Sequence, residues 1–169
     1  CKELAVNSSK KYSVLEEGLI YSDHTAQIPS DICVDRVSFM VGDACNLEDS
    51  LGTFDAVLAS NLLCRLPDPK KFLDRLSTLL NVGGIIVLVS PFSWLEEYTP
   101  QEKWIGGNPN VIDPETSKPV RSSDAVSAIF KNMNFELVAP TSHFPFLIRE
   151  HAHKFQWGCS EVQVWRKKQ

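Results

Sequence analysis

The chain has 169 residues, of which 43% are hydrophobic and 22% are charged, and its formal net charge at pH 7 is −4. This length and composition are typical of one soluble globular domain. The negative charge disfavours nucleic-acid binding, and no apolar run approaches the roughly 18 residues that would indicate a membrane-spanning helix.

The cysteine pattern favours a reduced protein. Five cysteines, at positions 1, 33, 45, 64 and 159, show no CxxC spacing, so neither a disulfide framework nor a zinc site is predicted. The start of the chain has no signal peptide pattern, and we expect a cytoplasmic protein. Because the chain begins with Cys1 and not with Met, we expect it to be a fragment of a longer protein.

The first 35 residues carry weak patterns. Residues 1–5 look like the tail of a helix, and residues 12–14 and 17–21 favour short extended pieces. Residues 22–35 are predicted to form a loop, because they include Pro29 and several small polar residues.

Two strands are predicted next. Residues 37–41 (VSFMV) are β-branched and aromatic and stop at a glycine, which is typical of a strand. Residues 54–60 (FDAVLAS) are nearly all apolar, which indicates a strand buried on both faces.

A helix and a third strand follow. Residues 67–69 (PDP) open a helix whose apolar face carries Leu73, Leu76, Leu79 and Leu80. We expect Gly83 and Gly84 to end this helix and residues 85–89 (IIVLV) to form a buried strand. Strand, helix and strand within about 40 residues predict a βαβ unit with parallel strands.

The second half of the chain contains a long loop. Residues 92–121 include four prolines and two glycines, and long loops in compact domains are usually functional. Ser122 or Ser123 is expected to cap the next helix. Residues 135–138 predict a strand, and residues 162–165 alternate as an antiparallel or edge strand does.

Three predicted strand ends are polar or small, where parallel α/β sheets bind their ligands. They are Gly42-Asp43-Ala44, Ser60-Asn61 and Ser90-Pro91. An Asp beyond a strand can accept hydrogen bonds from an exocyclic amine such as adenine N6, and an Asn can hold a polar atom near a reacting centre. An Asp after a Gly is also a common turn, so both interpretations of Asp43 stay open.

The order of residues 42–44, 54–58, a helix and residues 81–87 resembles the middle of a class I S-adenosylmethionine-dependent methyltransferase. This resemblance implies an acidic residue on the adenine and a strand that ends beside the methyl donor. The implied cofactor-binding residues are Asp43, Ala44, Asn61 and Leu62.

The implied fold is α/β, a partial Rossmann-like sheet that is mostly parallel with an antiparallel last strand. In this superfamily the sheet order is three, two, one, four, five, seven, six. The first strand with its glycine-rich cofactor loop, and the second strand with its acidic end, are not found in residues 1–169. We therefore expect one partial domain that is inactive alone, with residues 92–121 as a substrate-side insertion.

A narrower resemblance is to the C-terminal methyltransferase domain of ovothiol synthases. It rests on unusual stretches at residues 90–100, 102–107, 145–151, 154–157 and 164–166. This family implies N-methylation of the imidazole of 5-thiohistidine, a small-molecule substrate. The family also implies an iron-dependent sulfoxide synthase domain upstream in the parent chain. Residues 1–169 do not contain that domain, because none of their histidines lies in an HxxxHxE pattern.

Methyl transfer to a neutral imidazole nitrogen needs alignment more than a strong base. The substrate's carboxylate and ammonium groups need partners. Arg149 is the first candidate for the carboxylate because its fork binds bidentately, and Arg65 is the second. Glu96 or Glu97 could receive the ammonium group, and His143 could orient the substrate.

Aromatic side chains are the remaining pocket candidates. Tyr98, Trp94 and Trp104 could wall the pocket, because a sulfonium or an imidazolium favours aromatic faces, although ordinary core packing would explain them equally well. His151 and His153 form an HxH pair, but no further ligand completes a metal site, so no metal is predicted.

Two alternatives stay open beside the ovothiol prediction. One is a methyltransferase for another small molecule, and the other is an inactive methyltransferase-like binding module. Binding of S-adenosylmethionine would separate the enzymes from the inactive module.

Overall fold

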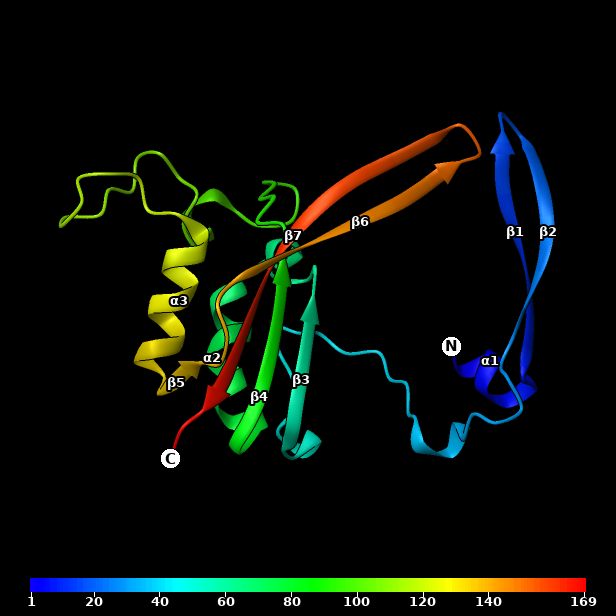
Figure 1. The fold of residues 1–169 in the computed structure, drawn as a ribbon, viewed down its shortest axis with the longest axis horizontal. Coiled ribbons are helices and arrows are strands. Elements are labelled where there is room, and N and C mark those ends of the chain that lie inside the picture. The colour runs from blue at the N-terminus through cyan, green and yellow to red at the C-terminus, as the bar shows by residue number, and fades with distance from the viewer. The chain divides into compact units, whose positions relative to one another are not determined.

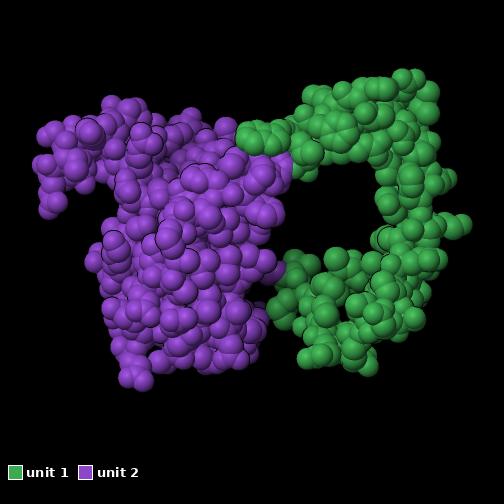
Figure 2. All heavy atoms as spheres, viewed as in Figure 1, with its two compact units in different colours: residues 1–41, 147–157 green, residues 42–146, 158–169 purple.

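The computed structural model describes all 169 residues, which fall into two units, coloured separately in Figure 2. Residues 1–41 and 147–157 form the first, here called the hairpin unit, and residues 42–146 and 158–169 form the second, here called the sheet unit. No helix is long and apolar enough to cross a membrane.

The hairpin unit begins with helix α1 (Lys2–Asn7), as predicted, and continues with an antiparallel hairpin (Figure 1). Its strands are β1 (Ser9–Glu17) and β2 (Ile20–Gln27). The turn uses Gly18 with a φ of 53°, a backbone conformation that costs glycine little. Across the strands, the Tyr12 ring stacks on His24 with centroids 5.6 Å apart.

Two predictions for this region are wrong. Residues 22–27 belong to β2 and not to a loop, because their backbone groups pair with β1. Residues 37–41 form no strand: no other segment pairs with them, and Met40 and Val41 are 70% and 99% exposed. A β-branched segment without a neighbouring strand has no partners for its backbone groups and does not form a ladder.

The larger sheet has five strands in the order β3-β4-β7-β5, with β6 paired to β7. It belongs to the sheet unit except for residues 147–157, which form the far ends of β6 and β7 and belong to the hairpin unit. Only β3 and β4 pair in parallel, whereas β7 pairs antiparallel with both β4 and β5. The prediction of a mostly parallel sheet is therefore wrong, because the chain returns through β7 between β4 and β5. The strands are β3 (Phe54–Ser60), β4 (Leu80–Ser90), β5 (Phe135–Leu137), β6 (Ser142–His151) and β7 (Lys154–Lys167).

Helix α2 (Pro69–Leu79) connects the two parallel strands, as predicted. Asp68 caps it by accepting a hydrogen bond from the backbone N–H of Lys71 at 3.3 Å, and Pro69 occupies the first turn, where its missing N–H costs nothing. The helix buries its apolar face, which comprises Phe72, Leu73, Leu76 and Leu79.

The cap residue Asp68 predicts an acid-sensitive contribution to stability. The pKa of its carboxyl lies below the usual value, chiefly because Lys103 Nζ donates a hydrogen bond to it at 2.8 Å. A lowered folded-state pKa stabilises the fold above the unfolded pKa of about 3.9, and this contribution is lost as the pH falls through the folded value. Asp68→Asn, which keeps the cap, should flatten the stability profile between roughly pH 5 and 2. Asp68→Ala should lose about 1 kcal/mol more.

Urea unfolding at several pH values measures both effects, with the exposed Asp31→Asn as the control. A profile of Asp68→Asn that superimposes on that of the wild type would show that the Lys103 pair contributes nothing.

Gly83 and Gly84 do not end α2, contrary to the prediction. The helix ends at Leu79, and both glycines lie in β4. The pairing of β3 with β4 steps from Phe54↔Leu80 to Ala56↔Ile85, so β4 bulges where the glycines stand. Gly83 has a φ of 80°, and a Cβ on Gly84 would lie 2.8 Å from the carbonyl oxygen of Asn81.

Helix α3 (Ser122–Asn132) follows the long loop 92–121. Arg121 stands at the cap position without a side-chain bond, so the predicted serine cap is wrong. The two serine hydroxyls are used in tertiary contacts instead: Ser122 accepts a hydrogen bond from Trp94 Nε1 (2.9 Å), and Ser123 donates one to Glu161 (2.6 Å).

The two faces of the sheet differ in burial. In register across β3, β4 and β7 stand Val57, Ile86 and Trp165, and then Ala59, Leu88 and Gln163. Ala59, Ile86, Leu88 and Trp165 join the core with residues of α2 and α3. On the other face Leu58 is 68% exposed, and its neighbours Ile85, Val87, Val89, Val162 and Val164 are only half-buried.

Candidate functional site

Asn61 immediately follows β3 at the carboxyl end of the parallel pair. Its backbone lies in the left-handed region with a φ of 52°, which Asn tolerates better than most residues. Its N–H donates to the carbonyl oxygen of Val89 at 2.8 Å. Its side-chain Oδ1 accepts a hydrogen bond from Ser160 Oγ at 2.7 Å. The side chain is therefore fixed at the edge where the two parallel strands end.

The chain also turns sharply after β4. Ser90 is fully buried, and its hydroxyl accepts a hydrogen bond from the N–H of Phe92 at 3.1 Å. Phe92 has a φ of 48°, which is unusual for a bulky residue. This turn presents Ser93 beside the segment that follows β3.

Arg65 ties these two segments together. Its Nη1 donates to the carbonyl oxygens of Ser93 at 2.7 Å and Cys64 at 2.9 Å. The guanidinium carbon also lies 4.9 Å from the centroid of the Tyr98 ring, within the range of a cation–π contact. Arg65 therefore holds Tyr98 beside the strand ends.

Tyr98 and Glu97 act as a pair. The pKa of the Tyr98 phenol is raised, mainly because it hydrogen-bonds to the Glu97 carboxylate and also because that charge disfavours the phenolate. A tyrosine phenol is neutral near pH 7 in any case, and the Glu97 carboxylate next to it can receive a cationic group. Asn61, Arg65, Ser93, Glu97 and Tyr98 are called the strand-end cluster below.

Comparison with known proteins identifies the family. The pattern of a family described as a methyltransferase domain matches residues 19–139. The chain belongs to this methyltransferase domain family. Membership of this family implies S-adenosylmethionine as the cofactor. The match begins at residue 19, so it includes just over half of the first 40 residues, which the resemblance from sequence did not cover.

Two relatives illustrate the similarity. Norajmaline N-methyltransferase of Rauvolfia serpentina is 31% identical over 90 residues, which cover 50% of this chain and 31% of that protein. A SAM-dependent methyltransferase from Methanosarcina mazei aligns with a TM-score of 0.50 at 18% identity, over 77% of this chain and 66% of that one. The chain thus spans about a third of the length of the first relative and just under two thirds of the second.

The sheet order agrees with the methyltransferase family. The order β3-β4-β7-β5 corresponds to strands four, five, seven and six of the class I sheet, and Asn61 and Leu62 follow strand four. Leu62 is half-buried and packs against the core, while Asn61 faces the strand ends through its bond to Ser160. Their predicted role as cofactor contacts stays a prediction.

The sequence suggested that Asp43 and Ala44 follow a strand, but no strand directly precedes them in the structure. Asp43 Oδ1 accepts a hydrogen bond from the N–H of Cys45 at 2.9 Å, and its carbonyl accepts one from Asn46, so it starts a turn. Ala44 packs against the core. The adenine contact of Asp43 stays a prediction, and its second carboxylate oxygen has no protein partner.

The tryptophans of the long loop serve as core. Trp94 is 9% exposed and stacks on Trp104 with centroids 6.3 Å apart. Trp104 Nε1 donates to the carbonyl of Thr99, whose buried hydroxyl donates to Leu66. Core packing therefore accounts for both rings, whereas Tyr98 is 43% exposed and available to a ligand. Glu96 is exposed as well.

Arg149 lies in the hairpin unit. Its Nη2 pairs with Glu16 at 2.8 Å, and not with Glu150, which pairs with Lys154 at 2.6 Å. His143 is an exposed residue of β6. The convergence of Arg149 and His143 with Tyr98 on one substrate stays a prediction. His151 and His153 stand with ring centroids 6.4 Å apart.

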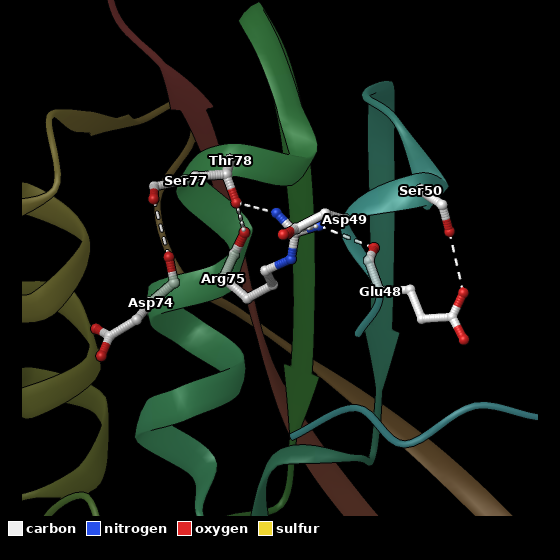
Figure 3. A network of polar contacts seen from close by, with 7 residues as sticks. All are labelled: Glu48, Asp49, Ser50, Asp74, Arg75, Ser77 and Thr78. Atoms are coloured by element: carbon white, nitrogen blue, oxygen red, sulfur yellow. Dashed lines mark hydrogen bonds and ion pairs between the residues drawn. The ribbon is translucent and has the colours of Figure 1, made fainter. Parts of the chain in front are cut away.

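A second feature, which no sequence pattern indicates, is a groove of about 710 Å³ between loop residues 45–49 and α2. Figure 3 shows Arg75 reaching from α2 to this loop, where Nη2 donates to the Glu48 carbonyl at 3.0 Å and lies 3.2 Å from Asp49. Arg75 also donates to the Thr78 hydroxyl, and its buried Nε has no partner. These contacts anchor the loop that leads into β3.

Proposed function

We propose that this chain contributes to S-adenosylmethionine-dependent N-methylation of a small imidazole, 5-thiohistidine, in ovothiol biosynthesis. The observation that carries the proposal is the strand-end cluster, in which Arg65, four residues after Asn61, contacts Ser93 and Tyr98 in the segments that follow the two parallel strands.

Two residues, Asn61 and Asp43, have polar groups that match groups of the cofactor. Asn61 offers amide donors at the strand ends, and Asp43 offers a free carboxylate oxygen for an exocyclic amine. When bound, the cofactor supplies an electrophilic methyl group. The chain's own residues bind and orient the acceptor so that a neutral imidazole nitrogen presents its lone pair.

The substrate groups have candidate partners of matching chemistry. Glu97 would receive the ammonium group, and the neutral Tyr98 would lie against the imidazole face or donate to a polar atom. Arg149 would give up its ion pair with Glu16 to bind the substrate carboxylate, and His143 would orient the imidazole ring. Arg65 is less suited to the carboxylate, because Ser93, Cys64 and Tyr98 already engage its guanidinium.

Two facts support transfer to nitrogen. The relative from Rauvolfia serpentina is an N-methyltransferase by name, and the stretches resembling ovothiol synthases include the segment that carries Glu97 and Tyr98. The resemblance to ovothiol synthases rests on the sequence alone, and the upstream sulfoxide synthase domain is part of the same proposal.

Product analysis of the full-length protein tests the proposal. With S-adenosylmethionine it should convert 5-thiohistidine to a product in which a methyl group replaces an imidazole N–H hydrogen, a net gain of CH2 with release of a proton, and histidine should react far more slowly. If the protein methylates only a different small molecule, the methyltransferase activity stands and the proposed substrate is wrong. Failure to bind S-adenosylmethionine would favour an inactive binding module.

Asp43 allows a test of the adenine contact. In the full-length protein Asp43→Ala should weaken S-adenosylmethionine binding by about 1–3 kcal/mol, because the exocyclic amine would lose its acceptor. Calorimetric titration measures this, with Asp113→Ala as a control on a turn carboxylate of the long loop. Equal affinities for Asp43→Ala and the wild type, both folded, would remove Asp43 from the site.

A further inference from the structure

The strand-end cluster has a side-chain contact that strand pairing does not require. Ser160 is fully buried in β7, and its hydroxyl makes one hydrogen bond, to Asn61 Oδ1 at 2.7 Å. The two residues lie 99 positions apart in the chain. A buried hydroxyl needs a partner, but a backbone carbonyl would serve as well as a half-buried amide.

This contact continues the sheet beyond the end of its backbone ladder. The paired region of β4 and β7 ends at Ser90↔Glu161, and β4 is followed by Pro91, which has no N–H to donate. Ser160, the residue next to Glu161, bonds to Asn61, which follows the last paired residue of β3. The hydrogen bond therefore links β3 and β7 past the end of β4.

Three constraints hold Asn61 in one conformation. They are its left-handed backbone, its N–H bond to Val89 and its side-chain bond to Ser160. Such constraint on a residue at a strand end is typical of a preorganised site. Since the amide oxygen accepts from Ser160, the amide nitrogen keeps both of its donors, and neither has a protein partner.

We infer that Ser160 is a positioning residue, which acts through Asn61 to aim the amide N–H groups at a carboxylate oxygen of a bound ligand. This inference rests on the proposed function and adds a residue and a ligand group to it. Two ligands carry such a carboxylate, namely the methionyl part of the cofactor and an amino-acid substrate.

The test uses Ser160→Ala, Asn61→Ala and the double variant in the full-length protein. If the cofactor supplies the carboxylate, each single change should weaken S-adenosylmethionine binding about tenfold, while binding of 5′-methylthioadenosine, which lacks the carboxylate, should stay within about twofold. If the substrate supplies it, cofactor binding should stay unchanged and KM for 5-thiohistidine should rise about tenfold with little change in kcat.

In either arm Ser160→Ala should have no further effect once Asn61 is Ala, because it acts through that side chain. Ser77→Ala, which removes a serine hydroxyl on α2 outside the cluster, is the matched control. Thermal unfolding checks that each variant is folded.

Two results would overturn the inference while leaving the proposed function intact. One is a folded Ser160→Ala protein with unchanged cofactor affinity and KM, and the other is a loss that adds in full to that of Asn61→Ala. A wild-type protein that fails to bind S-adenosylmethionine would overturn both, so the two failures are distinguishable.

Discussion

Replacing Trp165 with Ala is expected to lower the free energy of unfolding of the sheet unit by about 3–5 kcal/mol, the usual cost of removing a buried tryptophan. Its side chain is 0% exposed, and its ring stacks on Phe130 with centroids 5.1 Å apart. Its Nε1 donates to Gln163 Oε1 at 2.9 Å, so the change also leaves a buried acceptor without a partner. In β7 it is paired with Ile86 and Leu137, so the cavity would open at the centre of the sheet.

Urea unfolding followed by far-ultraviolet circular dichroism measures this loss. Trp157→Ala is the matched control, because Trp157 is 69% exposed and lies in the hairpin unit, and it should change stability by no more than about 0.5 kcal/mol. Equal stabilities for the two variants would show that the Trp165–Phe130 stack does not anchor the core.

The elements predicted correctly are those whose pattern depends on local chemistry. Strand β3, the leucine face of α2 up to Leu79 and its Asp68-Pro69 start appear where the sequence placed them. These signals need no knowledge of distant residues, since an amphipathic face and a helix cap are decided within a few turns. Two details are wrong: β3 is largely exposed and not buried on both faces, because no strand pairs with its outer edge, and Leu80 begins β4.

The errors arise where a distant partner decides the structure. Residues 37–41 have the composition of a strand but no neighbour to pair with, and residues 22–27 lack a strong pattern but pair with β1. The serines at 122 and 123 are good cap residues, yet Trp94 and Glu161 engage their hydroxyls. Pairing and tertiary hydrogen bonds of this kind cannot be read from one segment.

The residues of the candidate site also fall into those that local sequence predicts and those that depend on distant contacts. Asn61 was predicted because it follows a recognisable strand, and Tyr98 and Glu97 because a cationic substrate needs such partners. Arg65 was predicted as a carboxylate clamp, but its role beside Ser93 and Tyr98 depends on two loops meeting. Ser160 had no signal at all, because only the return of β7 brings it to Asn61.

One face and one edge of the sheet remain open. Strand β3 pairs only with β4, so one side of its backbone has no strand partner. Its Phe54 and Leu58 are 43% and 68% exposed, and the half-buried valines of β4 and β7 extend the same apolar face. Unpaired strand edges and contiguous apolar patches favour association between chains.

The 169-residue chain is therefore expected to self-associate as its concentration rises, and Leu58→Lys should suppress this association. A lysine on β3 would have to lose its hydration when a second chain covers this face, which opposes contact. Sedimentation velocity over a range of concentrations measures the effect. Leu19→Lys is the matched control, because Leu19 is 91% exposed in the β1–β2 turn, and it should associate as the wild type does. A wild-type chain that stays monomeric at every concentration, or a Leu58→Lys variant that associates equally, would show that the open face of β3 is not where chains meet.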